Sequence, residues 1–365
     1  YLSAYDKKEV DSEIHLQKPF EKMHDITKPY SIASNESTED NTYLSYNKVI
    51  GTSLDEKLYL AFQILDYALL SAPGAPITKA LLEAGIGKDI SGSYDSSTYQ
   101  PIFSIVAKNA NEEQKAEFVK VIEDTLKGIV ENGMDKKALE AGINYHEFRY
   151  READFGGYPK GLMYGLQIFD SWLYDETKPF IHVEALDTFV FLKEQISTGY
   201  FEKLIQAYLL DNQHGALVTI VPEPGRTARL DEELKAKLQA YKESLSREEI
   251  DKLVADTKHL QEYQEEPSSQ EDLEKIPMLT REDISREIAP IYNEEMKIAE
   301  IPTVFHEIET NGIGYLDLMF DLSDVPEKDL PMVGLLQAVL GIIDTEHYEY
   351  GELFNEINRY TGGIG

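Results

Sequence analysis

Hydrophobic side chains recur at helical and strand spacings over the first part of the chain, which predicts an α+β domain over residues 29–222. The clearest helix is predicted for residues 54–70, whose apolar positions follow steps of four, three and four: Leu58, Phe62, Leu65 and Leu69. Pro73 and Gly74 end it. Further helices are predicted for residues 77–84, 111–132 and 135–151 and within 158–210, and strands for 42–51, 90–97, 102–108 and 216–221. Residues 1–28 lack a sustained period and are predicted to be a connector, with an extended piece at 13–20.

Residues 223–290 differ in composition, because 29 of these 68 residues are charged, against 28% of the whole chain. Their apolar residues form two narrow stripes, Leu230, Leu234, Leu238, Tyr241 and Leu245, then Ile250, Leu253, Val254 and Leu260. Between the stripes, Ser246 and Glu249 fit a capping box that starts a second helix. The pattern predicts two antiparallel helices packed on each other, exposed on most sides, as a hairpin linker between domains.

Residues 291–365 return to an α+β pattern. Leu316, Leu318, Phe320 and Leu322 alternate with other residues, which predicts a half-buried strand. Helices are predicted for residues 327–340 and 350–360. A shift of about 271 residues lays the helix at 54–70 over the one at 327–340. We therefore expect a partial second copy of the first domain, although two amphipathic helices can also match by chance.

Composition narrows the possible partners. The chain has 35 Lys and Arg against 67 Asp and Glu, a net charge of −32. This excess argues against nucleic acids, whose phosphates repel acidic surfaces, and allows basic peptides, although acidic surfaces often serve solubility alone. No apolar run suits a membrane span and no signal peptide is visible. We expect a bacterial cytoplasmic protein. Because residue 1 is Tyr and the chain stops in a turn-rich sequence, we also expect a segment of a longer protein.

Motifs for catalysis are missing from the sequence. The closest pair of His residues is nine apart, so no His-x-x-Glu-His or reversed motif exists, and Cys is absent. Gly-x-Ser-x-Gly and Walker phosphate-loop motifs are missing too. One run stands out, residues 149–162. We interpret it as a helix end, a Gly turn and a Pro-started helix, with Arg151 and Glu152 paired, and a substrate-facing loop is the alternative.

Several of these motifs resemble a known family. The runs Arg151-Glu152-Ala153-Asp154-Phe155-Gly156 and Tyr158-Pro159-Lys160-Gly161-Leu162, with residues 35–40, resemble the second domain of presequence-protease-type enzymes of the insulinase/pitrilysin clan. The hairpin and residues 271–277 resemble their linker. Residues 310–322 and 360–364 resemble the start of their third domain. The resemblance covers essentially the whole chain, with the motifs in the same order.

The resemblance implies a parent zinc metallopeptidase with four homologous α+β domains, which degrades short unstructured peptides in a closed chamber. Its zinc would lie on an inverted His-x-x-Glu-His helix in the first domain, outside this segment. Laid over the two matching helices here, the three key positions fall on residues that cannot form a zinc site: Gln63, Asp66 and Tyr67, then Gly334, Gln337 and Ala338. We expect no metal ligand or catalytic residue in this chain.

The resemblance therefore implies a non-catalytic segment that supplies chamber wall and hinge. It would work with the remaining domains of its parent chain and with unstructured, possibly basic, peptides. The alternative is a structural or interaction homologue that has lost zinc in every domain. A helical adaptor built on residues 226–266 explains too little of the chain.

Overall fold

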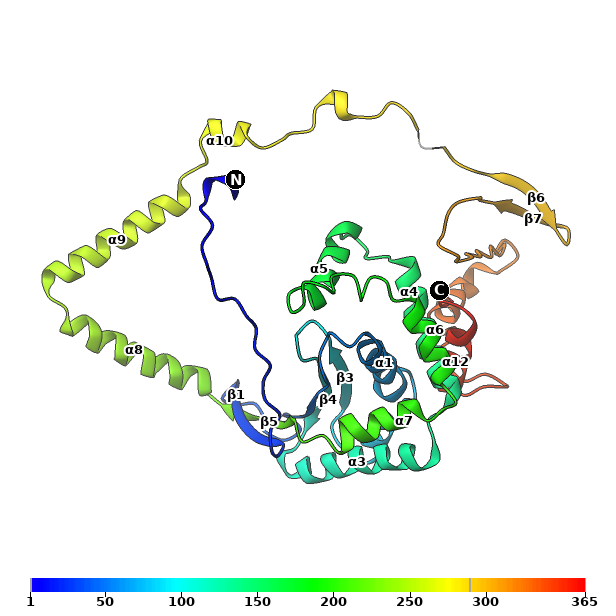
Figure 1. Cartoon of the computed structure of the whole chain (residues 1–365), viewed down its shortest axis with the longest axis horizontal. Helices are drawn as coiled ribbons and strands as arrows, with labels where there is room; N and C mark the ends of the chain where they lie inside the picture. Colours follow the sequence, from blue (N-terminus) through cyan, green and yellow to red (C-terminus); the bar gives the residue numbers. More distant parts are fainter. Residues whose placement is uncertain (1, 289, 365) are drawn as a thin grey trace. The chain divides into compact units, whose positions relative to one another are not determined.

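The structure is a computed structural model that describes residues 2–288 and 290–364 (Figure 1). It divides into two compact units. The first contains the residues up to Pro224 together with those from Asn311 onward, and the second runs from Gly225 to Thr310. The chain therefore leaves the first unit once and returns to it.

A mixed sheet forms the centre of the first unit. Its five strands are β1 (His24–Ile32), β2 (Thr42–Val49), β3 (Asp89–Asp95), β4 (Ile102–Ala110) and β5 (Gly215–Pro224), in the spatial order β1-β5-β2-β4-β3. Only β1 and β5 pair in parallel. Alternate residues of β2 are buried, Leu44 and Tyr46 completely, so one face of the sheet packs against helices.

Helices cover that face. They are α1 (Glu56–Asp66), α2 (Pro76–Glu83), α3 (Lys115–Asn132), α4 (Lys136–Glu152), α5 (Lys160–Trp172), α6 (Leu186–Gln195) and α7 (Tyr200–Leu204), with π-helical turns at Tyr67–Ser71 and Ile205–Leu210. Helix α1 begins at Asp55, whose carboxylate accepts a hydrogen bond from the Leu58 amide. Seven of its eleven residues are buried, which makes α1 the centre of the core. The predicted α+β fold is confirmed.

Strand β1 is the element that the sequence did not predict. Residues 24–32 pair with β5 in parallel, whereas the extended piece predicted at residues 13–20 is not a strand. Most residues of β1 are exposed. Its sequence therefore carries no apolar alternation, and its backbone pairing with β5 alone makes it a strand.

The part of the first unit after Asn311 contains α11 (Leu330–Val339) and α12 (Tyr350–Tyr360), where helices were predicted. The strand predicted from the alternation at residues 316–322 does not form. Leu316 is 81% exposed and Phe320 80% exposed. A strand needs a neighbour to receive its backbone hydrogen bonds, and the described residues pair none with this segment.

The second unit contains α8 (Arg226–Ser244), α9 (Arg247–Glu265), α10 (Gln270–Glu274) and the hairpin of β6 (Glu294–Ile298) and β7 (Ile301–Phe305). The predicted helix pair is present, and the capping box of Ser246 and Glu249 starts α9. The predicted packing along the two stripes is wrong, because side chains such as Leu234 and Leu238 are more than half exposed. Each stripe is too narrow to bury much apolar area, so the helices meet only near their join.

Candidate functional site

The first set of predicted site positions lies where α1 ends and becomes a π-helical turn. Gln63 and Asp66 are half-buried, and Tyr67 is buried. One carboxylate oxygen of Asp66 accepts a hydrogen bond from the Ser71 hydroxyl at 2.7 Å, and the other is buried without a partner. Burial raises the pKa of Asp66 and of Tyr67. The turn thus brings these three residues together, with the single carboxylate already engaged.

The Tyr67 ring is wedged between two helices. Its centroid lies 5.2 Å from that of Tyr145 on α4 and 6.4 Å from that of Phe354 on α12. Gly142 makes this approach possible, because a Cβ there would lie 2.9 Å from a carbon of the Tyr67 ring. The Tyr67 hydroxyl is buried and makes no hydrogen bond of good geometry, although the Asn358 amide approaches it.

One imidazole lies beside this turn, and no sequence pattern singled it out. The ring centroids of His146 and Tyr67 are 6.5 Å apart, and Nε2 of His146 is buried without a hydrogen-bond partner. Burial lowers the pKa of His146 to about 4, against the raising effect of the Gln63 carbonyl, so the ring is neutral at pH 7. A lone His inside a helix carries no motif, and only the fold places it here.

These groups do not fit a zinc site. Such a site needs about three nitrogen, oxygen or sulfur ligands around one open position. Here the carboxylate of Asp66 is bonded to Ser71, and an aromatic ring occupies the third position. Within residues 2–288 and 290–364, no three His, Cys, Asp or Glu side chains gather closely enough to hold a metal ion.

The second set of predicted positions lies on a different helix. Gly334, Gln337 and Ala338 are exposed residues of α11, and only Gln337 carries a polar side chain. The structure therefore places the two sets on separate helices, and neither offers a zinc-binding side chain of the expected type.

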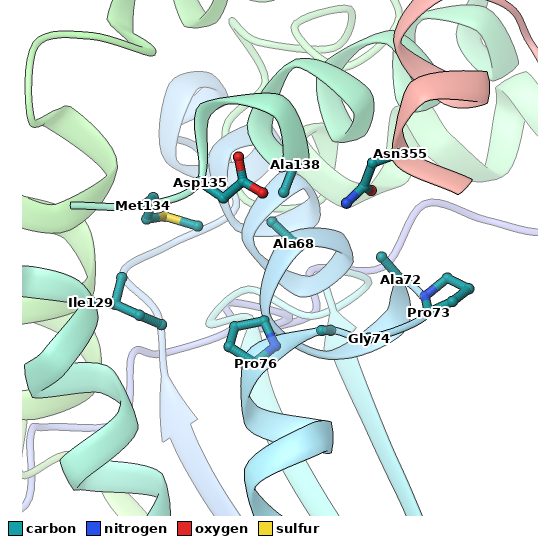
Figure 2. A pocket seen from close by; sticks show the side chains of 11 residues that line it. Ala68, Ala72, Pro73, Gly74, Pro76, Ile129, Met134, Asp135, Ala138 and Asn355 are labelled. Carbon is teal, nitrogen blue, oxygen red and sulfur yellow. The ribbon is translucent and has the colours of Figure 1, made fainter. Parts of the chain in front are cut away.

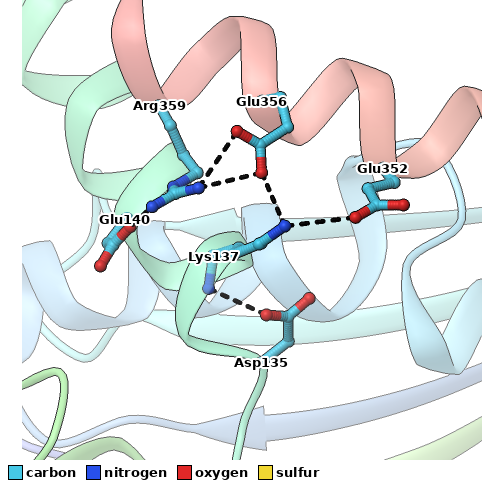
Figure 3. Close-up of polar contacts among 6 residues, drawn as sticks. All are labelled: Asp135, Lys137, Glu140, Glu352, Glu356 and Arg359. Atoms are coloured by element: carbon cyan, nitrogen blue, oxygen red, sulfur yellow. Dashed lines mark hydrogen bonds and ion pairs between the residues drawn. The ribbon is translucent and has the colours of Figure 1, made fainter. Parts of the chain in front are cut away.

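The surface of α4 carries a charged contact with α12 (Figure 3). Lys137 lies 2.8 Å from a carboxylate oxygen of Glu356 and 3.2 Å from one of Glu352. The Arg359 guanidinium reaches Glu140 at 2.6 Å and Glu356 at 2.9 Å. Lys137 and then Arg359 lower the pKa of Glu356, since positive neighbours favour its charged form.

The run at residues 149–162 ends α4 and begins α5. Ala153 adopts a left-handed conformation with φ of 47°, which stops α4, and α5 starts after Pro159, as predicted. Arg151 pairs with Glu147 at 2.8 Å, so the predicted pairing with Glu152 is wrong. Residues four apart lie on the same helix face, whereas adjacent residues do not. Glu152 accepts instead a hydrogen bond from the Tyr315 hydroxyl at 3.0 Å.

A pocket of about 280 Å³ lies beside the contact between α4 and α12 (Figure 2). Small side chains of the π-helical turn and of α2 line it, together with the ends of α3 and α4: Ala68, Ala72, Pro73, Ala75, Pro76, Ile129 and Met134. Asp135 and Asn355 add the polar atoms at its edge. The lining contains no nucleophile or base pair arranged for catalysis.

Two models of one peptidase family match this sequence. The model described as "Peptidase M16 inactive domain" matches residues 1–145, and the model of the associated domain of M16 peptidases of subfamily C matches residues 220–365. The chain belongs to the M16 peptidase family. The resemblance to presequence-protease-type enzymes is thereby confirmed, with the zinc-lacking turn at residues 63–67 inside the part that matches the inactive domain.

Relatives of this M16 segment are much longer. It is 44% identical over 364 residues to "Protein HypA" of Clostridium perfringens, covering 100% of this chain and 37% of that protein. It is 31% identical over 359 residues to "Presequence protease 1, chloroplastic/mitochondrial" of Arabidopsis thaliana, covering 97% and 33%. A solved M16 inactive domain from Pseudomonas fluorescens aligns with a TM-score of 0.43 at 12% identity, over 61% of this chain and 48% of that one. The segment thus spans about a third of the curated relatives it matches.

The helices of the M16 segment differ from membrane-crossing helices. Over the described ranges, none of them has the length and apolar character that a membrane crossing needs.

Proposed function

We propose that this chain is the non-catalytic segment of a zinc metallopeptidase that degrades short unstructured peptides inside a closed chamber. The observation that carries the proposal is the turn at Gln63, Asp66 and Tyr67, in a stretch similar to M16 inactive domains. The turn keeps the buried helix of a peptidase domain and lacks the ligands. The relative named presequence protease supports a peptidase as the parent.

Within this proposal, the two units have different roles. The first unit has a buried core around α1 and a five-stranded sheet, which suits a rigid chamber wall. The second unit has no buried side chain among its described residues, so little packing resists its bending. Residues 225–310 would then form the hinge between the wall and the remaining domains of the parent.

The charge of −32 favours basic peptides as substrates, if part of it faces the chamber. Salt would screen such an attraction, so the preference for basic over acidic peptides of matched length should fall as salt rises. Equal cleavage of both at low salt would contradict this part. A bacterial cytoplasmic location remains part of the proposal.

The test uses the full-length parent protein. We expect a His-x-x-Glu-His motif upstream of this segment, about one zinc per chain by metal analysis, and cleavage of a fluorogenic peptide that chelator abolishes and zinc restores. Tyr67→Phe is the matched control, because the proposal gives Tyr67 no catalytic role, and it should leave turnover unchanged. Zinc and turnover that depend on Asp66 or Tyr67 would overturn the assignment of this segment as non-catalytic.

A second candidate is a structural or interaction homologue without zinc in any domain. The loss of ligands at both sets of positions, 63–67 and 334–338, favours it. A parent without the upstream motif, without bound zinc and without peptide cleavage would support this candidate and refute the first.

A further inference from the structure

The exposed face of α4 holds residues 311–364 against the rest of the first unit. We propose that this face is a charge-controlled latch. When it is closed, both ends of the tether formed by residues 225–310 are fixed on one body. When it opens, the segment from Asn311 onward is released. The proposal rests on the contacts of this chain and needs no peptidase activity.

The charged part of the latch lies at the start of α4. Lys137 bridges Glu352 and Glu356, and Arg359 bridges Glu356 and Glu140 (Figure 3). Arg359 and Glu356 keep only 18% and 17% of their side chains exposed. Their charges therefore lie partly away from water, where an ion pair is screened less than at a fully exposed site.

Hydrogen bonds continue the contact along α4. The Asn144 amide donates to the carbonyls of Asn358 and Thr361 at 2.7 and 3.0 Å. At the other end of the helix, the Asn311 amide donates to the Arg151 carbonyl at 2.9 Å. That carbonyl belongs to the last turn of α4, which has no helical partner for it. The segment therefore contacts α4 at its start, its middle and its end.

The segment has little else to hold it. Among its described residues, only Asn358 is buried, and large apolar side chains of α11 and of residues 315–322 are exposed. The stack of Phe354 on Tyr67 is its main apolar contact with the core. Attachment that relies on polar contacts weakens with salt or charge change, whereas a large apolar interface would not.

The test separates the segment from its tether. Residues 267–269, an exposed stretch between α9 and α10, are replaced by a site for a specific protease, and the cut protein is run on size exclusion. We expect the C-terminal fragment to co-elute with the first unit at about 0.1 M salt. Raising the salt to about 1 M shortens the screening length from about 10 Å to about 3 Å and should weaken this association.

Two exposed lysines at the start of α4 provide a matched pair of variants. Lys137→Glu places a negative charge against Glu352 and Glu356, and should raise the dissociation constant of the fragment about ten-fold. Lys136→Glu makes the same charge change on the same turn, where no ion pair joins that side chain to the described residues, and should stay within about two-fold. Adding Glu352→Lys to Lys137→Glu should recover part of the loss.

Fluorescence of Trp172, which lies on α5 and outside the latch, verifies that the first unit stays folded in each variant. Release of the fragment from the unaltered chain at low salt would overturn the proposal. Equal release from the Lys137→Glu and Lys136→Glu variants would overturn it too, because the attachment would then not depend on these charge pairs.

Discussion

Gly142 is the position where α4 comes closest to the turn that carries Tyr67. A Cβ at Gly142 would lie 2.9 Å from the Tyr67 ring and 3.3 Å from the Ile64 side chain. Real Cβ atoms do not approach so closely, and the ring cannot retreat easily because Tyr145 and Phe354 pack against it. We therefore predict that Gly142→Ala destabilises the first unit.

The expected magnitude follows from two opposing terms. Ala in place of Gly inside a helix is favourable by about 1 kcal/mol. Overpacking a filled core is unfavourable by about 1–3 kcal/mol. The net change should be a destabilisation of up to about 2 kcal/mol. Gly128 is the matched control, since it lies inside α3 and a Cβ there meets no atom within 4 Å. Gly128→Ala should stabilise by about 0.5–1 kcal/mol.

The assay is thermal unfolding followed by the fluorescence of Trp172, which reports on the first unit. Each kcal/mol should shift Tm by about 2–4 °C in a unit of this size. The two variants should therefore move Tm in opposite directions. If Gly142→Ala raised Tm as much as Gly128→Ala, the Tyr67 ring would not be wedged against α4, and our account of why this turn excludes a metal would fail.

Burial and ligand identity decide three further outcomes. Burial lowers the pKa of His146 and His182 from 6.5 to about 4, so the unfolded chain binds more protons between these values. Stability should be complete above about pH 6.5 and fall by up to about 3 kcal/mol per His as the pH drops toward 4; a urea series that is flat over this range would contradict it. Leu238 is 55% exposed, so Leu238→Asp should change the free energy of unfolding by less than about 0.5 kcal/mol, and residues 226–265 should exchange amide hydrogens faster than α1; slow exchange there would show that the helices pack after all. The purified chain should bind no stoichiometric zinc and cleave no peptide, because the positions at 63, 66 and 67 lack the ligands; one zinc per chain by metal analysis would refute this.

Elements that depend on local sequence were predicted within a few residues. Helices α1, α4, α8 and α9 carry apolar periods, caps and breakers in adjacent residues, and the structure has them where the pattern places them. Strands depended on more distant partners. Residues 24–32 lack alternation and form β1 beside β5, whereas residues 316–322 alternate and form no strand. In both cases the presence of a hydrogen-bonding neighbour decided the outcome.

The candidate site shows the same division. Comparison of helices within the sequence identified Gln63, Asp66 and Tyr67 as the positions where zinc ligands are missing, because identity and spacing are properties of the chain itself. The sequence by itself therefore determined the family, the main helices and the lack of ligands. Only the tertiary structure decided that His146 lies beside Tyr67 without a partner and that α12 pairs its charges with α4. Those contacts join residues up to about 290 positions apart, such as Tyr67 and Phe354, which packing and charge bring together and no local pattern encodes.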